Sequence, residues 1–198
     1  MRLVIVSGFL GVGKTSVMLS LMDRLYDESV RFAVIENDFG KLGIDSKLVK
    51  RYGLDVTDLR GGCICCTLKS SLVETLRLLG ANMNPDMVLV EPTGVADPMQ
   101  ITMAVTEEYV GPEIDAIREI VVLDAERFIQ IKMAFRIPIM NHMRHANIVV
   151  INKSDKVDEE KLVKVEEAVR EMGFEGELLR VSAETGMNMY RVAEVVAE

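Results

Sequence analysis

The sequence predicts a doubly wound α/β fold, a single domain in which a mostly parallel sheet carries helices on both faces. Short β-branched runs alternate along the chain with longer segments of helical periodicity. Runs such as Met87-Val88-Leu89-Val90 are apolar at nearly every position, as strands buried on both faces require. The length of 198 residues fits one such domain, with a core large enough to fold without disulfides.

Strands and helices are expected in strict alternation. The strands are expected near residues 2–7, 31–37, 86–91, 119–124, 147–152 and 177–182. The helices are expected near residues 14–27, 67–79, 97–108, 126–143, 158–172 and 187–197. The helix over 158–172 has the clearest ends, because acidic residues fill its first turn and Gly173 follows it. The stretch 38–62 is irregular and long, and such loops usually carry function.

Charge and hydropathy exclude several classes of protein. The formal net charge is −8, which argues against binding to nucleic acid or to an anionic membrane, since both need a basic surface. No apolar run approaches the roughly 20 residues of a membrane span. The N-terminus leads into a glycine loop instead of a signal-peptide cleavage site, so we expect a first strand and a cytoplasmic protein.

A phosphate-binding loop follows the first expected strand. The run Gly8-Phe9-Leu10-Gly11-Val12-Gly13-Lys14-Thr15 fits the P-loop pattern G-x-x-x-x-G-K-[ST] and leads directly into a helical segment. Backbone N–H groups of such a loop and the helix N-terminus surround phosphate oxygens. Lys14 is expected on the β- and γ-phosphates and the Thr15 hydroxyl on Mg²⁺. The sequence therefore predicts a P-loop NTPase. The nucleotide-binding residues expected in this loop are Gly8, Gly11, Val12, Gly13, Lys14, Thr15 and Ser16.

A second loop predicts which base is bound. Asn152-Lys153-Ser154-Asp155 follows an expected strand, which is the arrangement that selects guanine in P-loop GTPases. The Asp155 carboxylate would accept from N1–H and N2–H₂ of guanine and would be left unpaired by ATP. Lys153 is expected to lay its stem over the base, and Asn152 to tie this loop to the phosphate loop. Ser182 and Ala183 resemble the second base-contacting loop of GTPases.

An acidic residue ends a third strand. Glu91 closes the run Leu89-Val90-Glu91 and Gly94 follows three residues later. In a P-loop fold this position faces Mg²⁺ and the γ-phosphate. Glu91 is therefore expected to hold a metal-bound or attacking water, and the Gly94 N–H to sense the γ-phosphate.

The three cysteines lie together in Cys63-Ile64-Cys65-Cys66. In a cytosolic protein, clustered thiols more often hold a metal or serve redox chemistry than form a structural disulfide. Three thiolates suit Zn²⁺, Co²⁺ or another soft metal ion and leave a fourth position open. In a regular strand Cys65 and Cys66 would point to opposite faces, so shared coordination needs a turn. With the motifs at 8–15, 36–40, 91–98 and 152–155, this cluster resembles the CobW-type metallochaperone GTPases, relatives of the urease- and hydrogenase-maturation GTPases.

The resemblance implies GTP binding and slow GTP hydrolysis, coupled to the handling of a transition metal and to a client metalloenzyme or cofactor-assembly protein. By this resemblance, Cys63, Cys65 and Cys66 correspond to the family's C-x-C-C thiols, and Glu36 corresponds to a further, acidic ligand. GTPases of this branch also form nucleotide-dependent homodimers, so by analogy a homodimer is expected here. The sequence departs from the family at Lys41, where relatives have glutamate, and stops at Glu198, so we expect the family's C-terminal domain to be absent or supplied by a separate chain.

Alternative interpretations remain open at this point. The chain could instead be a metal-storage module, or a thiol redox sensor, with vestigial GTPase activity. A P-loop kinase is disfavoured by the base-reading loop at 152–155. His142 and His145, spaced i, i+3, are interpreted as solvated helix residues, and the 13 methionines as flexible core filler.

Overall fold

In the computed structural model of the chain, the described residues form one sheet of six parallel strands, in the order β2-β3-β1-β4-β5-β6. The structure describes residues 1–36, 64–92, 98–108 and 114–197. The strands are β1 (Arg2–Ser7), β2 (Phe32–Glu36), β3 (Met87–Glu91), β4 (Ala116–Asp124), β5 (Ile148–Asn152) and β6 (Glu177–Arg180). The helices are α1 (Lys14–Asp27), α3 (Ile64–Asn82), α4 (Pro98–Glu108), α5 (Phe128–Met143), the short 3₁₀ helix η1 (Ser154–Lys156), α6 (Glu159–Glu171) and α7 (Met189–Ala197).

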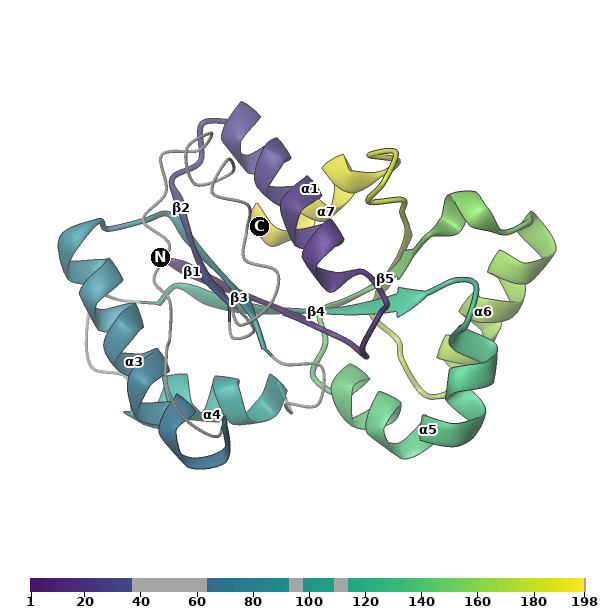
Figure 1. Ribbon diagram of the computed structural model, residues 1–198, viewed down its shortest axis with the longest axis horizontal. Coiled ribbons are helices and arrows are strands. Elements are labelled where there is room, and N and C mark those ends of the chain that lie inside the picture. Colours follow the sequence, from purple (N-terminus) through teal and green to yellow (C-terminus); the bar gives the residue numbers. More distant parts are fainter. Residues whose placement is uncertain (37–63, 93–97, 109–113, 198) are drawn as a thin grey trace.

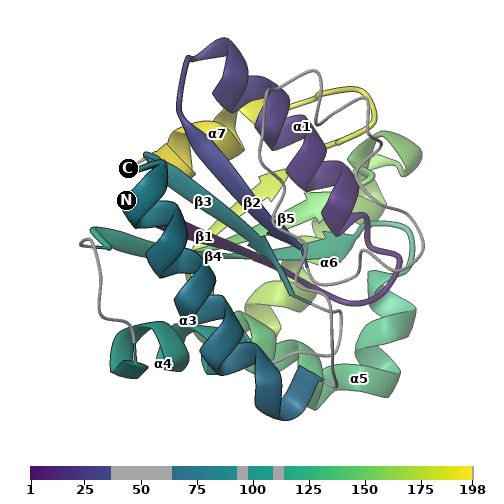
Figure 2. The ribbon, with the colours of Figure 1, turned by 60° about the vertical axis from the view of Figure 1, so that its left-hand side comes forward.

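Helices cover both faces of the sheet (Figures 1 and 2). Side chains alternate along β1, so Val4 and Val6 pack against α1 and α7 while Leu3 and Ile5 pack on the opposite face with α3 and α4. Further along that second face, α5 and α6 cover β4 and β5. The doubly wound α/β fold predicted from the sequence is therefore confirmed.

The strand order creates the crevice where a ligand is expected. The chain leaves β1 toward β2 and β3 on one side of the sheet, and later continues through β4, β5 and β6 on the other. Open α/β sheets bind ligands at the carboxyl ends of strands, where this order reverses. At these ends lie Ser7, Glu91, Asp124 and Asn152.

Several boundaries differ from the prediction. β4 begins at Ala116, three residues before the start expected at 119. The charged Arg118 interrupts the apolar pattern of this first part, so the sequence does not show it as a strand. The Glu119 carboxylate is nevertheless buried and accepts a hydrogen bond of 2.6 Å from Thr102 Oγ1. β6 ends at Arg180 instead of 182, since Ser182 pairs with Met187 in an isolated antiparallel bridge.

Two helices also differ from their expected form. α3 begins at Ile64, so the backbone of Cys65 and Cys66 lies in its first turn and not in the strand or turn considered from the sequence. α5 contains Pro138 and is interrupted at Phe135, where φ is −127° and ψ is 33°. A proline removes one backbone donor and crowds the preceding turn, which accounts for a break in this helix.

In the part of the chain that the structure describes, no helix has both the length and the apolar character needed to cross a membrane.

An exposed ion pair joins the starts of β2 and β3. Two guanidinium nitrogens of Arg31 donate to the Asp86 carboxylate at 3.1 and 2.8 Å, and the Arg31 N–H donates at 3.1 Å. The guanidinium hydrogen bond holds the pKa of Asp86 below its ordinary value. A lowered pKa in the folded state gives stability that is present above the unfolded pKa of about 3.9 and is lost as pH falls through the folded pKa.

We expect Asp86→Asn to lower the Tm slightly at neutral pH, because both side chains are largely exposed. The difference from the parent chain should vanish at strongly acidic pH. Thermal melts followed by circular dichroism across this range measure it, with Glu160→Gln in the exposed Lys164–Glu160 pair as the control. A Tm difference that stays constant down to acid pH would show that the pair does not act through this titration.

Candidate functional site

The phosphate loop between β1 and α1 depends on two glycines. Gly8 has φ +139°, and a Cβ there would lie 2.5 Å from the Val122 carbonyl oxygen. Gly13 has φ +91°, and a Cβ there would lie 2.5 Å from Asn152 Nδ2. Both positions combine a left-handed backbone with no room for a side chain, which only glycine accepts. The motif glycines therefore shape the loop against β4 and the base-reading loop.

The amino end of α1 is suited to an anion. Gly13 occupies the N-cap position and supplies no side-chain hydrogen bond, and the first turn holds no acidic residue. Helix N-termini attract phosphate through their N–H groups and the positive end of the helix dipole. Lys14 is buried, and its Nζ donates to the Phe9 carbonyl at 3.4 Å. The Lys14 ammonium thus lies across the phosphate loop, where it is predicted to bind phosphate.

Thr15 and Glu91 lie together, as the sequence predicts. The Thr15 hydroxyl donates to the Glu91 carboxylate, with Oγ1 3.1 Å from each carboxylate oxygen. A hydroxyl and a carboxylate supply the hard oxygen ligands that Mg²⁺ prefers. This donor pair, beside the phosphate loop, fits the predicted Mg²⁺ site.

Asn152 joins the phosphate loop to the base-reading loops. It is 3% exposed, its Nδ2 donates to the Val12 carbonyl at 3.0 Å, and its Oδ1 accepts from the Ala183 N–H at 3.0 Å. The expected tie to the phosphate loop is confirmed. The second bond, to Ala183, was not predicted and fixes the next loop by the same side chain.

Lys153 adopts a left-handed backbone with φ +62°. Its Nζ donates to the Gly11 carbonyl at 3.1 Å and to the Asp124 carboxylate at 2.6 Å. Asp155 follows on η1 with an exposed side chain. The loop therefore presents a carboxylate outward while its lysine is anchored inward.

Ser182 has a structural position in the second base loop. It is fully buried, its hydroxyl accepts from the Thr185 N–H at 3.2 Å, and its N–H donates to the Met187 carbonyl at 3.1 Å. Close by, the Lys156 ammonium pairs with Glu184 at 2.8 Å across the two loops, which raises the pKa of Lys156. Ala183 is partly exposed and takes part in the rim of the site.

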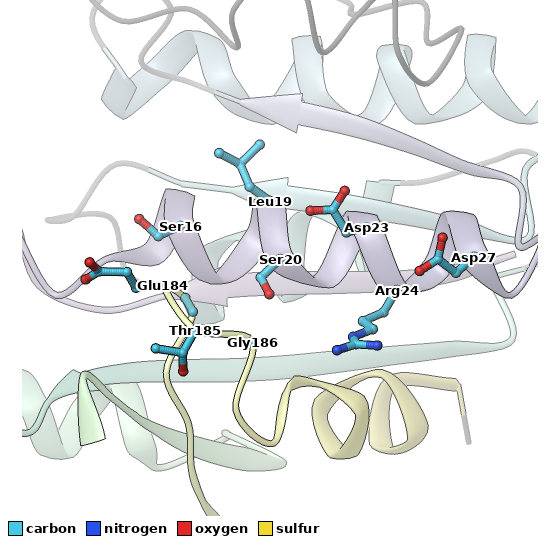
Figure 3. Close-up of a pocket in the computed structure, with 10 residues that line it drawn as sticks. Ser16, Leu19, Ser20, Asp23, Arg24, Asp27, Glu184, Thr185 and Gly186 are labelled. Carbon is cyan, nitrogen blue, oxygen red and sulfur yellow. The ribbon is translucent and has the colours of Figure 1, made fainter. Parts of the chain in front are cut away.

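A hollow of about 700 Å³ lies between α1 and the turn after Ser182 (Figure 3). At one end it contains Ser16 and Ala183, two residues predicted to bind nucleotide. It continues along the polar face of α1 past Asp23 and Arg24, which the sequence analysis did not single out. Their helical spacing from Ser16 could have indicated this face.

Asp124 is a further site residue that sequence reasoning missed. It ends β4, its side chain is 1% exposed, and it holds Lys153. The available signal was a carboxylate directly after the apolar run Ile120–Leu123, the same pattern that identified Glu91.

Some predicted residues lie outside what the structure describes. Gly94 and Cys63 are outside the described residues, as are the side chains of Glu36, Cys65 and Cys66. Within the described ranges, no group of three or more His, Cys, Asp or Glu side chains is arranged to hold a metal. The transition-metal site therefore stays a prediction.

The interpretation of His142 as a solvated residue is wrong. His142 is 7% exposed, and its ring lies 5.7 Å from that of Phe9 in the phosphate loop. His142 lies about one helical turn after the buried Ile139, whereas His145 is exposed and lies beyond the end of α5.

Comparisons with known proteins place this chain among related sequences and folds. The zinc chaperone YeiR of Escherichia coli (strain K12) is 34% identical over 156 residues, covering 79% of this chain and 47% of that protein. The zinc chaperone CobW of Pseudomonas aeruginosa is 30% identical over 196 residues, covering 81% of this chain and 51% of that protein. The crystal structure of Helicobacter pylori HypB in complex with nickel has the same fold, with a TM-score of 0.66 at 16% identity over 99% of this chain and 85% of that chain.

This chain thus spans about half the length of the curated relatives that it matches. A family model described as the CobW/HypB/UreG nucleotide-binding domain matches residues 2–179, which include the phosphate loop, the acidic strand end and the base-reading loop. The chain therefore belongs to the CobW/HypB/UreG family of nucleotide-binding domains.

Proposed function

We propose that this chain binds and slowly hydrolyses GTP, and that its nucleotide state controls the binding or transfer of a transition metal. The observation that carries the nucleotide part is the double hydrogen bond of Asn152, which ties the phosphate loop at Val12 to the base loop at Ala183. One buried side chain thereby fixes the distance between the phosphate-binding and base-binding parts of the crevice. This is the arrangement that a nucleoside triphosphate needs.

The phosphates would lie against the open N-terminus of α1. Lys14 would exchange its bond to the Phe9 carbonyl for the β- and γ-phosphate oxygens. Thr15 and Glu91 would hold Mg²⁺, which neutralises the charge that develops on the transferred phosphoryl group. Glu91 would also hold a metal-bound or attacking water, and the Gly94 N–H would sense the γ-phosphate.

Guanine would be selected by Asp155. Its exposed carboxylate can accept two N–H groups of guanine, and adenine would leave it unsatisfied. Lys153 would cover one face of the base with its stem, because its ammonium is held at Gly11 and Asp124.

The metal would be Zn²⁺ or Co²⁺, bound as cargo by Cys63, Cys65 and Cys66 with Glu36 as a further ligand. Two relatives named zinc chaperones favour Zn²⁺. The segment between β2 and α3 connects the strand end at Glu36 to the thiols, so γ-phosphate contacts could order it and hydrolysis release it. A client metalloenzyme or cofactor-assembly protein would receive the metal, and a nucleotide-dependent homodimer is the expected assembly.

The test is reciprocal linkage between metal and nucleotide. Zn²⁺ affinity should change when a non-hydrolysable GTP analogue is bound, and the affinity for that analogue should change by the same factor when Zn²⁺ is bound. Replacing all three cysteines by Ser should abolish stoichiometric Zn²⁺ binding and leave GTP binding intact. Calorimetry on anaerobically purified protein measures both quantities, with His145→Asn as the control for a non-ligand side chain.

Metal titrations that are identical with and without nucleotide would contradict the coupling. Metal retained by the triple variant would show that the ligands lie elsewhere. Tight Zn²⁺ binding together with negligible GTP turnover would instead favour the metal-storage alternative.

A further inference from the structure

Asp124 lies at the carboxyl end of β4, between two strands that carry nucleotide loops. It ends β4, which pairs with β1 before the phosphate loop and with β5 before the base-reading loop. Asp124 itself is in register with Asn152. A carboxylate at this position can reach both loops, and its side chain is 1% exposed.

Both oxygens of Asp124 are engaged, and by different partners. Oδ1 accepts from the backbone N–H of Glu126 at 2.8 Å and of Arg127 at 3.3 Å, in the turn that leads to α5. Oδ2 receives the Lys153 ammonium at 2.6 Å. The turn fixes the carboxylate plane, so the second oxygen faces Lys153 in a defined direction.

Lys153 in turn reaches the phosphate loop. Its Nζ is shared between Asp124 and the Gly11 carbonyl, and its side chain is 25% exposed. A lysine side chain has four rotatable methylenes and, without an anchor, would take many rotamers in water. The hydrogen bonds of the ammonium to Gly11 and Asp124 restrict the Lys153 side chain to one conformation over the crevice.

We propose that Asp124 is a positioning residue for guanine-nucleotide binding: it acts through Lys153, pinning the lysine between the base-reading loop and Gly11 of the phosphate loop. The proposal rests on the proposed placement of GTP in this crevice. It assigns Asp124 no contact with the nucleotide. The competing interpretation is that Asp124 only shapes the turn before α5.

A double-mutant cycle on GDP affinity separates these interpretations. Asp124→Asn keeps an oxygen for the turn and removes the charge that holds the lysine. Lys153→Met keeps the stem and removes the ammonium. Each single variant should weaken GDP about tenfold, the expected loss for a hydrogen bond to a charged group. The double variant should be no weaker than Lys153→Met alone, because Asp124 has nothing left to position.

Asp155→Asn serves as the matched control, since it removes a base contact that does not pass through Asp124. In the double variant, the fold-loss of GDP affinity from Asp155→Asn should multiply with the fold-loss from Asp124→Asn. Independent, multiplying losses for Asp124→Asn and Lys153→Met would overturn the proposal, as would GDP affinity within about twofold of the parent for Asp124→Asn. If an Asp124 variant does not fold, Lys153→Arg is compared with Lys153→Met. Arg keeps a cation for Asp124 and should retain GDP affinity within a few-fold, and a loss as large as that of Lys153→Met would overturn the proposal.

The same set of variants distinguishes failure of the proposed nucleotide site from failure of the positioning role alone. If Lys153→Met and Asp155→Asn both leave GDP affinity unchanged, the proposed nucleotide site fails, and the positioning role fails with it. If these two variants weaken GDP and Asp124→Asn does not, only the positioning role fails.

Discussion

Replacing Lys14 by Met should lower kcat/KM for GTP by at least about 100-fold, the loss typical when one preorganised charge-stabilising donor is removed from an active site. Lys14 is buried at the amino end of α1, with its ammonium held across the loop by the Phe9 carbonyl. No acidic side chain occupies the first turn of α1, so this ammonium and the helix N–H groups supply the local positive charge in a chain of net charge −8. Removing it leaves the γ-phosphate charge without this compensation in the transition state.

Met suits this test because it keeps the unbranched stem of lysine in a buried position. The variant should remain folded, which a thermal melt checks alongside phosphate release under saturating Mg²⁺. Lys164→Ala is the control, because Lys164 is an exposed lysine paired with Glu160 on α6. Turnover that is unchanged in a folded Lys14→Met protein would exclude Lys14 from the chemistry and weaken the assignment of the phosphate loop.

The sequence predicts the elements of this fold well because their signals are local. The buried strands β1, β3 and β5 are apolar at almost every position, and Asp158 caps α6 by accepting from the Lys161 N–H at 2.9 Å. The expected start of β4 at 119 is too late, because Arg118 interrupts the apolar pattern of its first part. A charged residue inside a strand looks like the end of that strand when only its neighbours in sequence are considered.

The sequence also predicts those site residues whose signals are local. Residues within a motif, such as Lys14 or Asp155, are recognisable by spacing alone. Asp124 follows an apolar run, but what connects it to the site is Lys153, which lies 29 positions further along the chain. The order of the strands brings these two together, and strand order is a long-range property that a motif does not contain. The burial of His142 was missed because it lies against Phe9, a residue far away in the sequence.

Asn152→Ala is the second change for which we expect a large effect, because one side chain holds two loops. Its loss leaves the Val12 carbonyl and the Ala183 N–H without these bonds. A buried polar group that loses its partner costs about 1–3 kcal/mol, so unfolding should become easier by that order. GDP and ATP affinity should both fall more than tenfold, since the phosphate loop itself loses its support.

This loss of affinity for both nucleotides distinguishes Asn152 from Asp155. Asp155→Asn should weaken GDP and spare ATP, so the ratio of the two affinities separates a residue that positions loops from one that reads the base. Asn152→Asp provides a finer control: it keeps an acceptor for the Ala183 N–H and turns an oxygen toward the Val12 carbonyl. If Asn152→Asp binds GDP as weakly as Asn152→Ala, the bond to the phosphate loop is the important one. If Asn152→Ala keeps the Tm and the GDP affinity of the parent chain, the loops are held by other contacts, and the observation on which the proposed function depends loses its force.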